Sequence, residues 1–431
     1  MKDFGTSSDP AVQTQLDRLA ALSVPQGRLG LETIRALLSR LGNPHLALPP
    51  VFHVAGTNGK GSTCAFLRAM LEAQGHRVHA ATSPHLVRYN ERIRVAGELI
   101  SDARLAELLA EVLDAGSDLA PSFFEVTIAA SFLEFARVPA DACVVEVGLG
   151  GRFDATNVIP RPAVCGIAAL GIDHERFLLA PDEDVPAEPL ARIAFEKAGI
   201  AKPGVPLVTF DYLPEAATAV ERVADRVGAS LFAQAMDGGW SVDATHDRIA
   251  YADRQGTLSL PLPALPGLHQ ARNAALAVAM LRHQQAVSVS PEAMAAGIRA
   301  ARWPARLQRL APGPLTGARE IWLDGGHNPS AGATLAQHFA GQRLHVVIGM
   351  IEGKDPMALV APLAPSIASL AAVPVPDHDY HPPEAFGEIA RAAPDIPAAL
   401  AALPDDGLPV LIAGSLYLAG EVLRLNGEWP D

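Results

Sequence analysis

The sequence is poor in cysteine, in aromatic residues and in charge. Only three of its 431 residues are cysteines, at positions 64, 143 and 165, and none belongs to a C-x-x-C pair. This excludes a disulfide-based scaffold and is typical of a reducing compartment. Aromatic residues make up 5% of the chain and charged residues 19%, whereas 49% is hydrophobic. Such a composition suits the small aliphatic cores of parallel sheets covered by helices.

Long apolar runs and basic clusters are also missing. No window approaches the ~18 uninterrupted apolar residues of a membrane span. The first ten residues, MKDFGTSSDP, lack the basic start and apolar stretch of a signal peptide. The formal net charge of -13 would repel nucleic acid and anionic membranes. We therefore expect a soluble, cytoplasmic protein that binds neither nucleic acid nor a membrane.

The length predicts two domains, because one hydrophobic core rarely grows to 431 residues. Short apolar runs alternate with helical patterns in the first part, which favours an α/β fold with a doubly wound, mostly parallel sheet. The predicted strands are residues 51–55, 78–81, 142–147, 163–170 and 205–210. Residues 237–262 instead alternate in the manner of a small antiparallel sheet.

Helices are predicted at about 270–283 and 291–301, and a Pro- and Arg-rich hinge region follows at 302–317. The strand and helix alternation then restarts, with strands at 321–323, 345–348, 369–373 and 409–413. We therefore predict one domain over residues 1–301 and a second, smaller, Rossmann-like α/β domain over residues 302–431.

A glycine-rich turn between the first strand and its helix is the sharpest chemical signal. It runs Gly56, Thr57, Asn58, Gly59, Lys60, Gly61, Ser62. Glycines let backbone N–H groups turn toward an anion, the helix start adds positive partial charge, and a lysine reaches the outer phosphates. We interpret the turn as a phosphate-binding loop (P-loop) for a nucleoside triphosphate.

The turn departs from the usual G-x-x-x-x-G-K-[ST] pattern, because position 54 is Val and Gly61 separates Lys60 from Ser62. An ordinary glycine turn is the alternative. A second glycine cluster, Gly148 to Gly151, does not fit G-x-G-x-x-G, since position 153 is Phe. A dinucleotide site is therefore not favoured.

Three candidate metal ligands stand at or just beyond the carboxyl ends of predicted strands, where open α/β sheets bind their ligands. They are Ser83, Glu146 and His174. A hydroxyl and a carboxylate suit Mg²⁺, whereas an imidazole is less typical of it. Each residue also has a structural interpretation, as a helix cap, a turn or a hydrogen-bonded pair.

The second domain offers a comparable polar cluster after the strand at 321–323. It comprises Asp324, Gly325, Gly326, His327 and Asn328. The alternative is a turn in which Asn328 or Ser330 caps the next helix.

Taken together, these strings resemble the folylpolyglutamate synthase/dihydrofolate synthase family of the Mur ligase superfamily over nearly the whole chain. The first domain carries HVAGTNGKGS at 53–62, SPHLV at 83–87, NERI at 90–93, FFE at 123–125, EVGLGGR at 146–152, DATN at 154–157, DH at 173–174 and EKAGI at 196–200. The second carries Asp324, HNP at 327–329, IGM at 348–350 and GSLY at 414–417. The resemblance implies a Mur ligase central-domain fold for residues 1–301, as an ATP-binding domain with the pterin/folate site, and a ligase domain for residues 302–431.

The resemblance also implies roles for individual residues. Thr57, Asn58, Gly59, Lys60, Gly61 and Ser62 would bind ATP phosphates, and Asn273, Arg306 and Asp324 would contact the nucleotide. Ser83, Glu146 and His174 would coordinate magnesium together with Lys197 as a carbamate. The pterin or folate would contact Gly27, Arg28, Leu29, Ser122, Phe123, Phe124, Glu125, Phe153, Asp154 and Ala155. Lys60, Lys197 and His327 would be the catalytic residues.

The implied activity is that of an ATP- and Mg²⁺-dependent ligase of folate biosynthesis and one-carbon metabolism. It would join L-glutamate to dihydropteroate and to the γ-glutamyl tail of reduced folates through an acyl phosphate, and the enzyme would be a monomer. The alternatives are a UDP-sugar-type Mur ligase and a P-loop switch that hydrolyses nucleotide. Two stretches depart from the family pattern: the segment from His174 to Lys197 is longer, and residues 168–171 lack a small hydroxyl residue.

Overall fold

The structure is a computed structural model that describes residues 5–22, 30–180, 182–245 and 247–430. Contacts divide the chain into two compact units. The first contains Met1–Pro84, Arg88–Ala264 and Gln270–Arg302, and the second contains His85–Val87, Leu265–His269 and Trp303–Asp431. The described residues contain no helix that combines the length and apolar character needed to span a bilayer.

The first unit is built on an eight-stranded sheet in the order β4-β3-β2-β5-β1-β6-β7-β8. Its strands from β2 to β8 run parallel in that order, and β3 and β4 add an antiparallel edge. The strands are β1 (Val51–Ala55), β2 (Val78–Ala81), β3 (Ile93–Val95), β4 (Glu98–Leu99), β5 (Ala142–Glu146), β6 (Val164–Ile167), β7 (Pro206–Thr209) and β8 (Ser230–Ala233).

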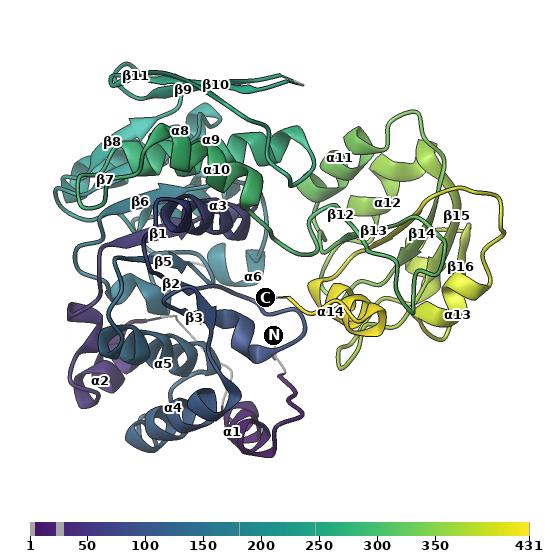
Figure 1. Cartoon of the computed structure of the whole chain (residues 1–431), viewed down its shortest axis with the longest axis horizontal. Coiled ribbons are helices and arrows are strands. Elements are labelled where there is room, and N and C mark those ends of the chain that lie inside the picture. The colour runs from purple at the N-terminus through teal and green to yellow at the C-terminus, as the bar shows by residue number, and fades with distance from the viewer. Residues whose placement is uncertain (1–4, 23–29, 181, 246, 431) are drawn as a thin grey trace. The chain divides into compact units, whose positions relative to one another are not determined.

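Helices cover both faces of this sheet, which confirms the doubly wound α/β fold (Figure 1). They are α1 (Pro10–Ala20), α2 (Glu32–Arg40), α3 (Lys60–Ala73), α4 (Asp102–Ala115), α5 (Phe123–Arg137), α6 (Glu175–Leu178), α7 (Pro189–Ala198), α8 (Pro214–Val227), α9 (Leu268–Arg282) and α10 (Pro291–Ala300).

The strand residues alternate between the two faces, as a pleated sheet requires. Val51 and Val145 pack into the core formed with α1, α2, α4 and α5, and Cys165 and Ile167 pack with α7 and α8. The opposite face is covered by α3, α9 and α10. There Gly166 of β6 lies so close to Met280 of α9 that an added Cβ would stand 2.3 Å from the sulfur.

A small antiparallel sheet, in the order β11-β10-β9, belongs to the same unit. Its strands are β9 (Trp240–Ala244), β10 (Ile249–Asp253) and β11 (Gly256–Leu260), which confirms the expectation for residues 237–262. Trp240 fastens it to the large sheet, because its indole Nε1 donates to the carbonyl of Thr209 at 3.1 Å.

The second unit is a six-stranded sheet in the order β12-β13-β17-β14-β15-β16, in which only β12 is antiparallel to its neighbour. Helices α11 and α12 pack on one face and α13 and α14 on the other. The elements are β12 (Gln308–Arg309), β13 (Ile321–Asp324), α11 (Pro329–His338), β14 (Leu344–Ile348), α12 (Met357–Leu363), β15 (Ile367–Ala372), β16 (Ala390–Ala392), α13 (Ile396–Ala401), β17 (Val410–Ala413) and α14 (Leu416–Asn426).

Two predicted elements differ from the structure in a way that matters for the site. The predicted strand 163–170 ends at Ile167, because the Tyr212 hydroxyl bonds the carbonyls of Ile167 and Ala168, and Ala169 turns its carbonyl to the glycine-rich loop. The predicted hinge region contains β12, and Ala305 and Leu307 within it adopt positive φ angles of 57° and 45°.

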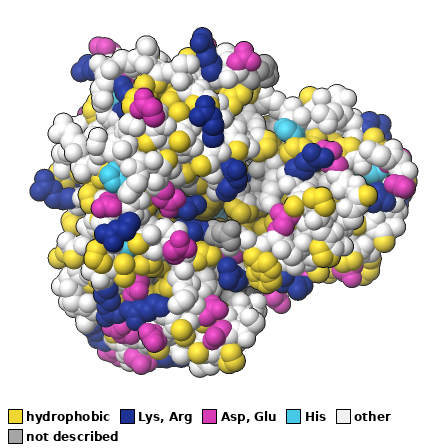
Figure 2. Space-filling model, in the orientation of Figure 1, with side chains coloured by type: hydrophobic (Ala, Val, Ile, Leu, Met, Phe, Trp, Pro, Cys, Tyr) yellow, Lys and Arg dark blue, Asp and Glu magenta, His cyan; other side chains and the backbone are white. Residues whose placement is uncertain are grey.

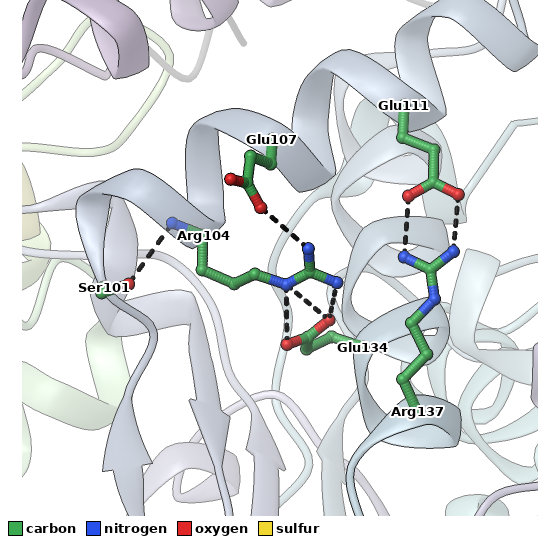
Figure 3. Close-up of polar contacts among 6 residues, drawn as sticks. All are labelled: Ser101, Arg104, Glu107, Glu111, Glu134 and Arg137. Atoms are coloured by element: carbon green, nitrogen blue, oxygen red, sulfur yellow. Dashed lines mark hydrogen bonds and ion pairs between the residues drawn. The ribbon is translucent and has the colours of Figure 1, made fainter.

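Surface charge in the first unit is mixed. Over α4, basic and acidic side chains intermingle in the view of Figure 2. Figure 3 shows one such network, in which Arg104 of α4 forms a bidentate pair with Glu134 of α5 and also reaches Glu107. The side chain of Glu134 is only 7% exposed, whereas the neighbouring Arg137 and Glu111 pair is 40% and 43% exposed.

Candidate active site

The glycine-rich loop joins β1 to α3 in a shape that only glycine permits at two positions. Gly56 and Gly59 have φ angles of +151° and +82°. A Cβ on Gly56 would stand 2.8 Å from the Cβ of Ala168, and one on Gly59 would stand 2.5 Å from Oδ1 of Asn273. The loop therefore needs both glycines for its conformation and for its close contacts.

The start of the loop is fastened to the chain that follows β6. The amides of Thr57 and Asn58 donate to the Ala169 carbonyl at 2.8 and 3.1 Å, and the Thr57 hydroxyl donates to the Gly171 carbonyl at 2.9 Å. These two amides are already bonded. The N–H groups left for an anion are those from Gly59 to Ser62, because the first turn of α3 offers them no intrahelical acceptor.

Two lysines share one backbone carbonyl in this loop. The Nζ atoms of Lys60 and Lys197 donate to the Gly56 carbonyl at 3.1 and 2.9 Å. Lys197 comes from the last turn of α7 and is buried. Burial, and then the charge of Lys60, lower the pKa of Lys197 to about 7. A substantial share of Lys197 is therefore the neutral, nucleophilic amine at physiological pH.

The three predicted metal ligands end neighbouring strands around β1. Ser83 follows β2, Glu146 ends β5 and His174 follows β6, and the sheet order places β2, β5, β1 and β6 side by side. The Ser83 amide donates to Oε2 of Glu146 at 3.1 Å, so these two residues are in contact. His174 adopts a left-handed conformation with φ of 52°.

Among the residues that the structure describes, no group of three His, Cys, Asp or Glu side chains is arranged to hold a metal ion. A hydroxyl and a carboxylate beside a phosphate-binding loop nonetheless fit Mg²⁺, which keeps several waters and takes its other oxygens from phosphates. The coordination by Ser83, Glu146 and His174 stays a prediction.

The residues predicted to contact the pterin at the start of α5 also stabilise the fold. Ser122 and Glu125 form a capping box at the helix start: the Glu125 carboxylate accepts from the Ser122 amide at 2.8 Å, and the Glu125 amide donates to the Ser122 hydroxyl at 3.3 Å. Phe123 packs edge-on against Tyr89. Phe124 is partly buried over Gly148, where an added Cβ would stand 2.4 Å from Cζ of the ring.

The other predicted pterin contacts lie in or near the loop after β5. Asp154 is buried and starts the short helix η3 (Ala155–Val158); its carboxylate accepts from Leu149 and Thr156, and burial raises its pKa. Ala155 is buried, and the Phe153 ring lies under the Arg152 guanidinium at 4.3 Å. Gly27, Arg28 and Leu29 lie outside the described residues.

Sequence reasoning missed a charge cluster beside Lys197. Arg152 binds Glu196 at 2.8 Å and Asp182 at 2.7 Å, and Arg192 binds Glu196 at 3.2 Å. The Arg192 and Glu196 spacing of four residues on a helix was the available signal. Asp182 belongs to the long segment between His174 and Lys197, and it contacts both Arg152 in the loop after β5 and, at 3.9 Å, Arg192 of α7.

Asn273, predicted to contact the nucleotide, lies over the loop on α9. Its Oδ1 faces Gly59, and its Nδ2 donates to Oε1 of Gln270 at 3.1 Å. Gln270 is buried and was not predicted, although the spacing of three residues places it on the same helix face.

The second unit holds the remaining predicted residues together at the carboxyl end of β13. The Asp324 carboxylate accepts from the amides of Leu307 and Gly326 at 2.8 and 2.7 Å, and Arg306 directly precedes Leu307 in the sequence. Nδ1 of His327 lies 3.3 Å from the Gly325 carbonyl. Asn328 caps α11 through Ala331, as the alternative interpretation proposed.

The fold defines the class: an α/β unit with a glycine-rich loop between β1 and α3, followed by a second α/β unit, as in Mur-type ligases. No protein-family model matches the chain. The chain is 35% identical to the dihydrofolate synthase/folylpolyglutamate synthase of Bacillus subtilis (strain 168) over 349 residues, 75% of this chain and 76% of that protein.

Solved structures agree. Escherichia coli FolC in complex with DHPP and ADP matches with a TM-score of 0.85 at 31% identity, covering 97% of this chain and 98% of that one. A bifunctional folylpolyglutamate synthase/dihydrofolate synthase with Mn, AMPPNP and L-glutamate bound matches with a TM-score of 0.83 at 28% identity, covering 97% and 98%. The chain belongs to the folylpolyglutamate synthase/dihydrofolate synthase family of ATP-dependent ligases.

Proposed function

We propose that this chain joins L-glutamate to two acceptors, dihydropteroate and the γ-glutamyl tail of reduced folates, with ATP and Mg²⁺. One observation carries the proposal. Four neighbouring parallel strands, β2, β5, β1 and β6, bring Ser83, Glu146, the P-loop and His174 to the same edge of the sheet. Lys197 donates to the same loop from α7.

The ligands of the solved relatives support each substrate class. One relative binds DHPP and ADP, and another binds AMPPNP, Mn and L-glutamate. In this chain, the N–H groups from Gly59 to Ser62 and the Lys60 ammonium suit a triphosphate. The Phe124 ring over Gly148 suits a flat heteroaromatic ring.

The reaction needs a leaving group, because a carboxylate oxygen is too poor a leaving group to be displaced by an amine. An acceptor carboxylate oxygen attacks the terminal phosphorus of ATP, the bond between the β and γ phosphates breaks, and ADP leaves. The neutral amine of glutamate then attacks the acyl carbon of the acyl phosphate. The tetrahedral intermediate expels inorganic phosphate, the amine loses a proton, and an amide bond remains.

Lys60 and the amides of the loop would offset charge on the transferring phosphoryl group, which is the main catalytic demand of such a transfer. Magnesium, held through Ser83, Glu146 and His174, would neutralise the phosphate oxygens when bound. Other residues of the chain contribute by holding these groups in position. Arg152 and Glu196, for example, hold the end of α7 that presents Lys197 to Gly56.

Lys197 would act as a carbamate, formed when its neutral amine adds to carbon dioxide and loses a proton. Two features support this role: the side chain is buried, and its pKa is lowered to about 7. The carbamate would convert a buried cation into an anion beside Lys60, which replaces a repulsion with an attraction and supplies oxygen ligands to the ion.

Other parts of the proposal rest on the family. Asn273, Arg306 and Asp324 would contact the nucleotide, and His327 would take part in proton transfer. Residues 1–301 would form the ATP-binding domain and residues 302–431 the ligase domain. We further propose that the enzyme works as a monomer in the cytoplasm.

The test measures ADP formation with L-glutamate and either dihydropteroate or tetrahydrofolate, together with the mass of the product. We expect ADP release that requires both the acceptor and glutamate, and a product heavier by one glutamyl residue from each acceptor. A UDP-sugar-type Mur ligase would use neither acceptor. A P-loop switch would release phosphate without an acceptor, and that outcome would refute the proposal.

A further inference from the structure

A buried chain of polar groups connects β1 to the loop after β5. Nε2 of His53 lies 2.8 Å from Oγ1 of Thr156, and Oγ1 of Thr156 donates to Oδ1 of Asp154 at 2.5 Å. The other carboxylate oxygen, Oδ2, accepts from the amide of Leu149 at 2.8 Å. His53 and Thr156 are 0% exposed and Asp154 is 4% exposed, so water does not compete for these contacts.

The number of available protons decides which groups donate and which accept in this series of hydrogen bonds. The Thr156 hydroxyl has one proton, and the Asp154 carboxylate accepts it. Nε2 of His53 must therefore carry the proton of the neutral imidazole and donate to Oγ1. Burial lowers the pKa of His53 to about 3, which keeps the ring neutral. Its Nδ1 is left with no hydrogen-bond partner among the described residues.

An apolar side chain would fill this interior position without leaving a buried nitrogen unpaired, so packing alone does not explain His53. Within the described part of the chain, the hydrogen bond to Thr156 is the one polar contact of the His53 side chain. At the far end, the Asp154 carboxylate accepts from the amide of Leu149, and the outer end of the Phe124 ring packs against the preceding residue, Gly148.

The opposite end of the same loop is held by separate contacts. Nδ2 of Asn157 donates to the carbonyls of Arg152 and Gly199 at 2.9 and 3.0 Å. Loss of the His53 bond would therefore loosen the Gly148 end and leave the α7 end, with Lys197, in place.

We propose that His53 is a positioning residue for the acceptor: through Thr156 and Asp154 it fixes the Gly148–Leu149 backbone, and so the position of the Phe124 ring that packs against Gly148. This inference rests on the proposed function, because it assigns the free surface of Phe124 to stacking with the acceptor's ring. His53 lies in β1 only three residues before Gly56, yet its polar contact runs to the acceptor loop and not to the nucleotide loop.

The experiment compares His53→Leu, which removes the donor, with His53→Gln, whose amide N–H reaches the same hydroxyl. For His53→Leu we expect the KM for dihydropteroate to rise about tenfold, while the KM for ATP and kcat change less than about twofold. His53→Gln should restore most of the acceptor KM. A general structural defect would shift all three constants together and would not be repaired by Gln.

A second pair of variants keeps the test decisive if His53→Leu does not fold. Thr156→Val removes the link and Thr156→Ser keeps it, so only Thr156→Val should raise the acceptor KM. In the double variant His53→Leu/Thr156→Val, the effect should be no larger than that of Thr156→Val alone, since both changes break one chain. Equal shifts in the KM for ATP and for the acceptor, or additive effects, would overturn the proposal.

The activity of the wild-type enzyme shows whether a negative result concerns the positioning role of His53 or the proposed function itself. If it forms no glutamylated product from dihydropteroate, the proposed function fails. If it does form that product but the His53 and Thr156 variants show no selective rise in the acceptor KM, only the positioning role fails.

Discussion

Lys197 allows the most direct test of the buried-amine chemistry. Its pKa is lowered from 10.5 to about 7. At pH 7 about half of its side chains would then be neutral, against roughly one in 3,000 for an ordinary lysine. Since only the neutral amine adds to carbon dioxide, the environment raises the reactive fraction by about three orders of magnitude.

The assay is ¹³C NMR of the enzyme in ¹³C-labelled bicarbonate, read alongside turnover. Wild-type enzyme should show one carbamate resonance that exhaustive removal of carbon dioxide abolishes, and activity should fall with it. Lys197→Ala should lack the resonance and lose about 10²-fold or more in kcat. Lys202→Ala is the matched control, because the Lys202 side chain is only partly buried and donates to Asn157 rather than to Gly56 of the glycine-rich loop.

Chemical rescue separates a carbamate from an ammonium. If Lys197 acts as a carbamate, acetate or formate should restore part of the turnover of Lys197→Ala and alkylammonium salts should not. Rescue by alkylamines alone, or full wild-type activity without carbon dioxide, would refute the reasoning.

The same pKa shift predicts a pH dependence of stability. The folded-state pKa lies below the unfolded value, so the unfolded chain binds more protons between about pH 7 and 10. This group therefore makes the fold more stable as pH rises through that window. In buffer free of carbon dioxide, where Lys197 is the unmodified amine, Lys197→Met buries no charge and should unfold at a higher temperature than wild type at pH 7, and the difference in Tm should narrow toward pH 10. A difference in Tm that stays constant with pH would show that the pKa of Lys197 is not lowered in the folded protein.

Three further predictions concern the glycine-rich loop, the ion pair of Arg104 with the buried Glu134, and the contact of Phe124 with Gly148. Lys60→Met should lower kcat by about 10²-fold or more, whereas Arg68→Met on the same helix should leave kcat nearly unchanged; steady-state turnover distinguishes them. Arg104→Met should cost roughly 1–3 kcal/mol in urea unfolding because it leaves a buried carboxylate unpaired, and Arg137→Met only about 0–1 kcal/mol; equal losses would contradict this account. Gly148→Ala should raise the KM for the acceptor, because the added methyl group displaces the Phe124 ring, and should leave the KM for ATP unchanged. An unchanged KM for the acceptor would mean that the acceptor's ring binds away from Phe124.

Patterns in the sequence that are local were predicted well. The strand at Val51–Ala55 and the turn from Gly56 to Ser62 follow from a run of apolar residues and from glycines that the structure holds at positive φ. The strand ends at Ala81, two residues before Ser83, and at Glu146 followed in the same way, from apolar runs that stop there. The capping box of Ser122 and Glu125 was not predicted, although S-x-x-E before an apolar run is its local signature.

Contacts between distant segments could not be predicted. The sequence does not say that Asp182 reaches Arg152, or that His53 reaches Thr156, because both pairs depend on how the loops after β5 and β6 fold onto α7 and β1. The end of β6 was predicted too late for a similar reason. The hydroxyl of Tyr212, which lies in a distant loop, donates to the carbonyls of Ile167 and Ala168, where the predicted strand would have continued.

The proposed function requires that a triphosphate and its divalent ion bind at the carboxyl edge of β2, β5, β1 and β6. A crystal structure with AMPPNP and Mg²⁺ tests this directly. It should place the phosphates against the amides from Gly59 to Ser62 and the ion beside Ser83 and Glu146. Nucleotide bound at another site, or phosphates with no contact to Lys60, would contradict the account.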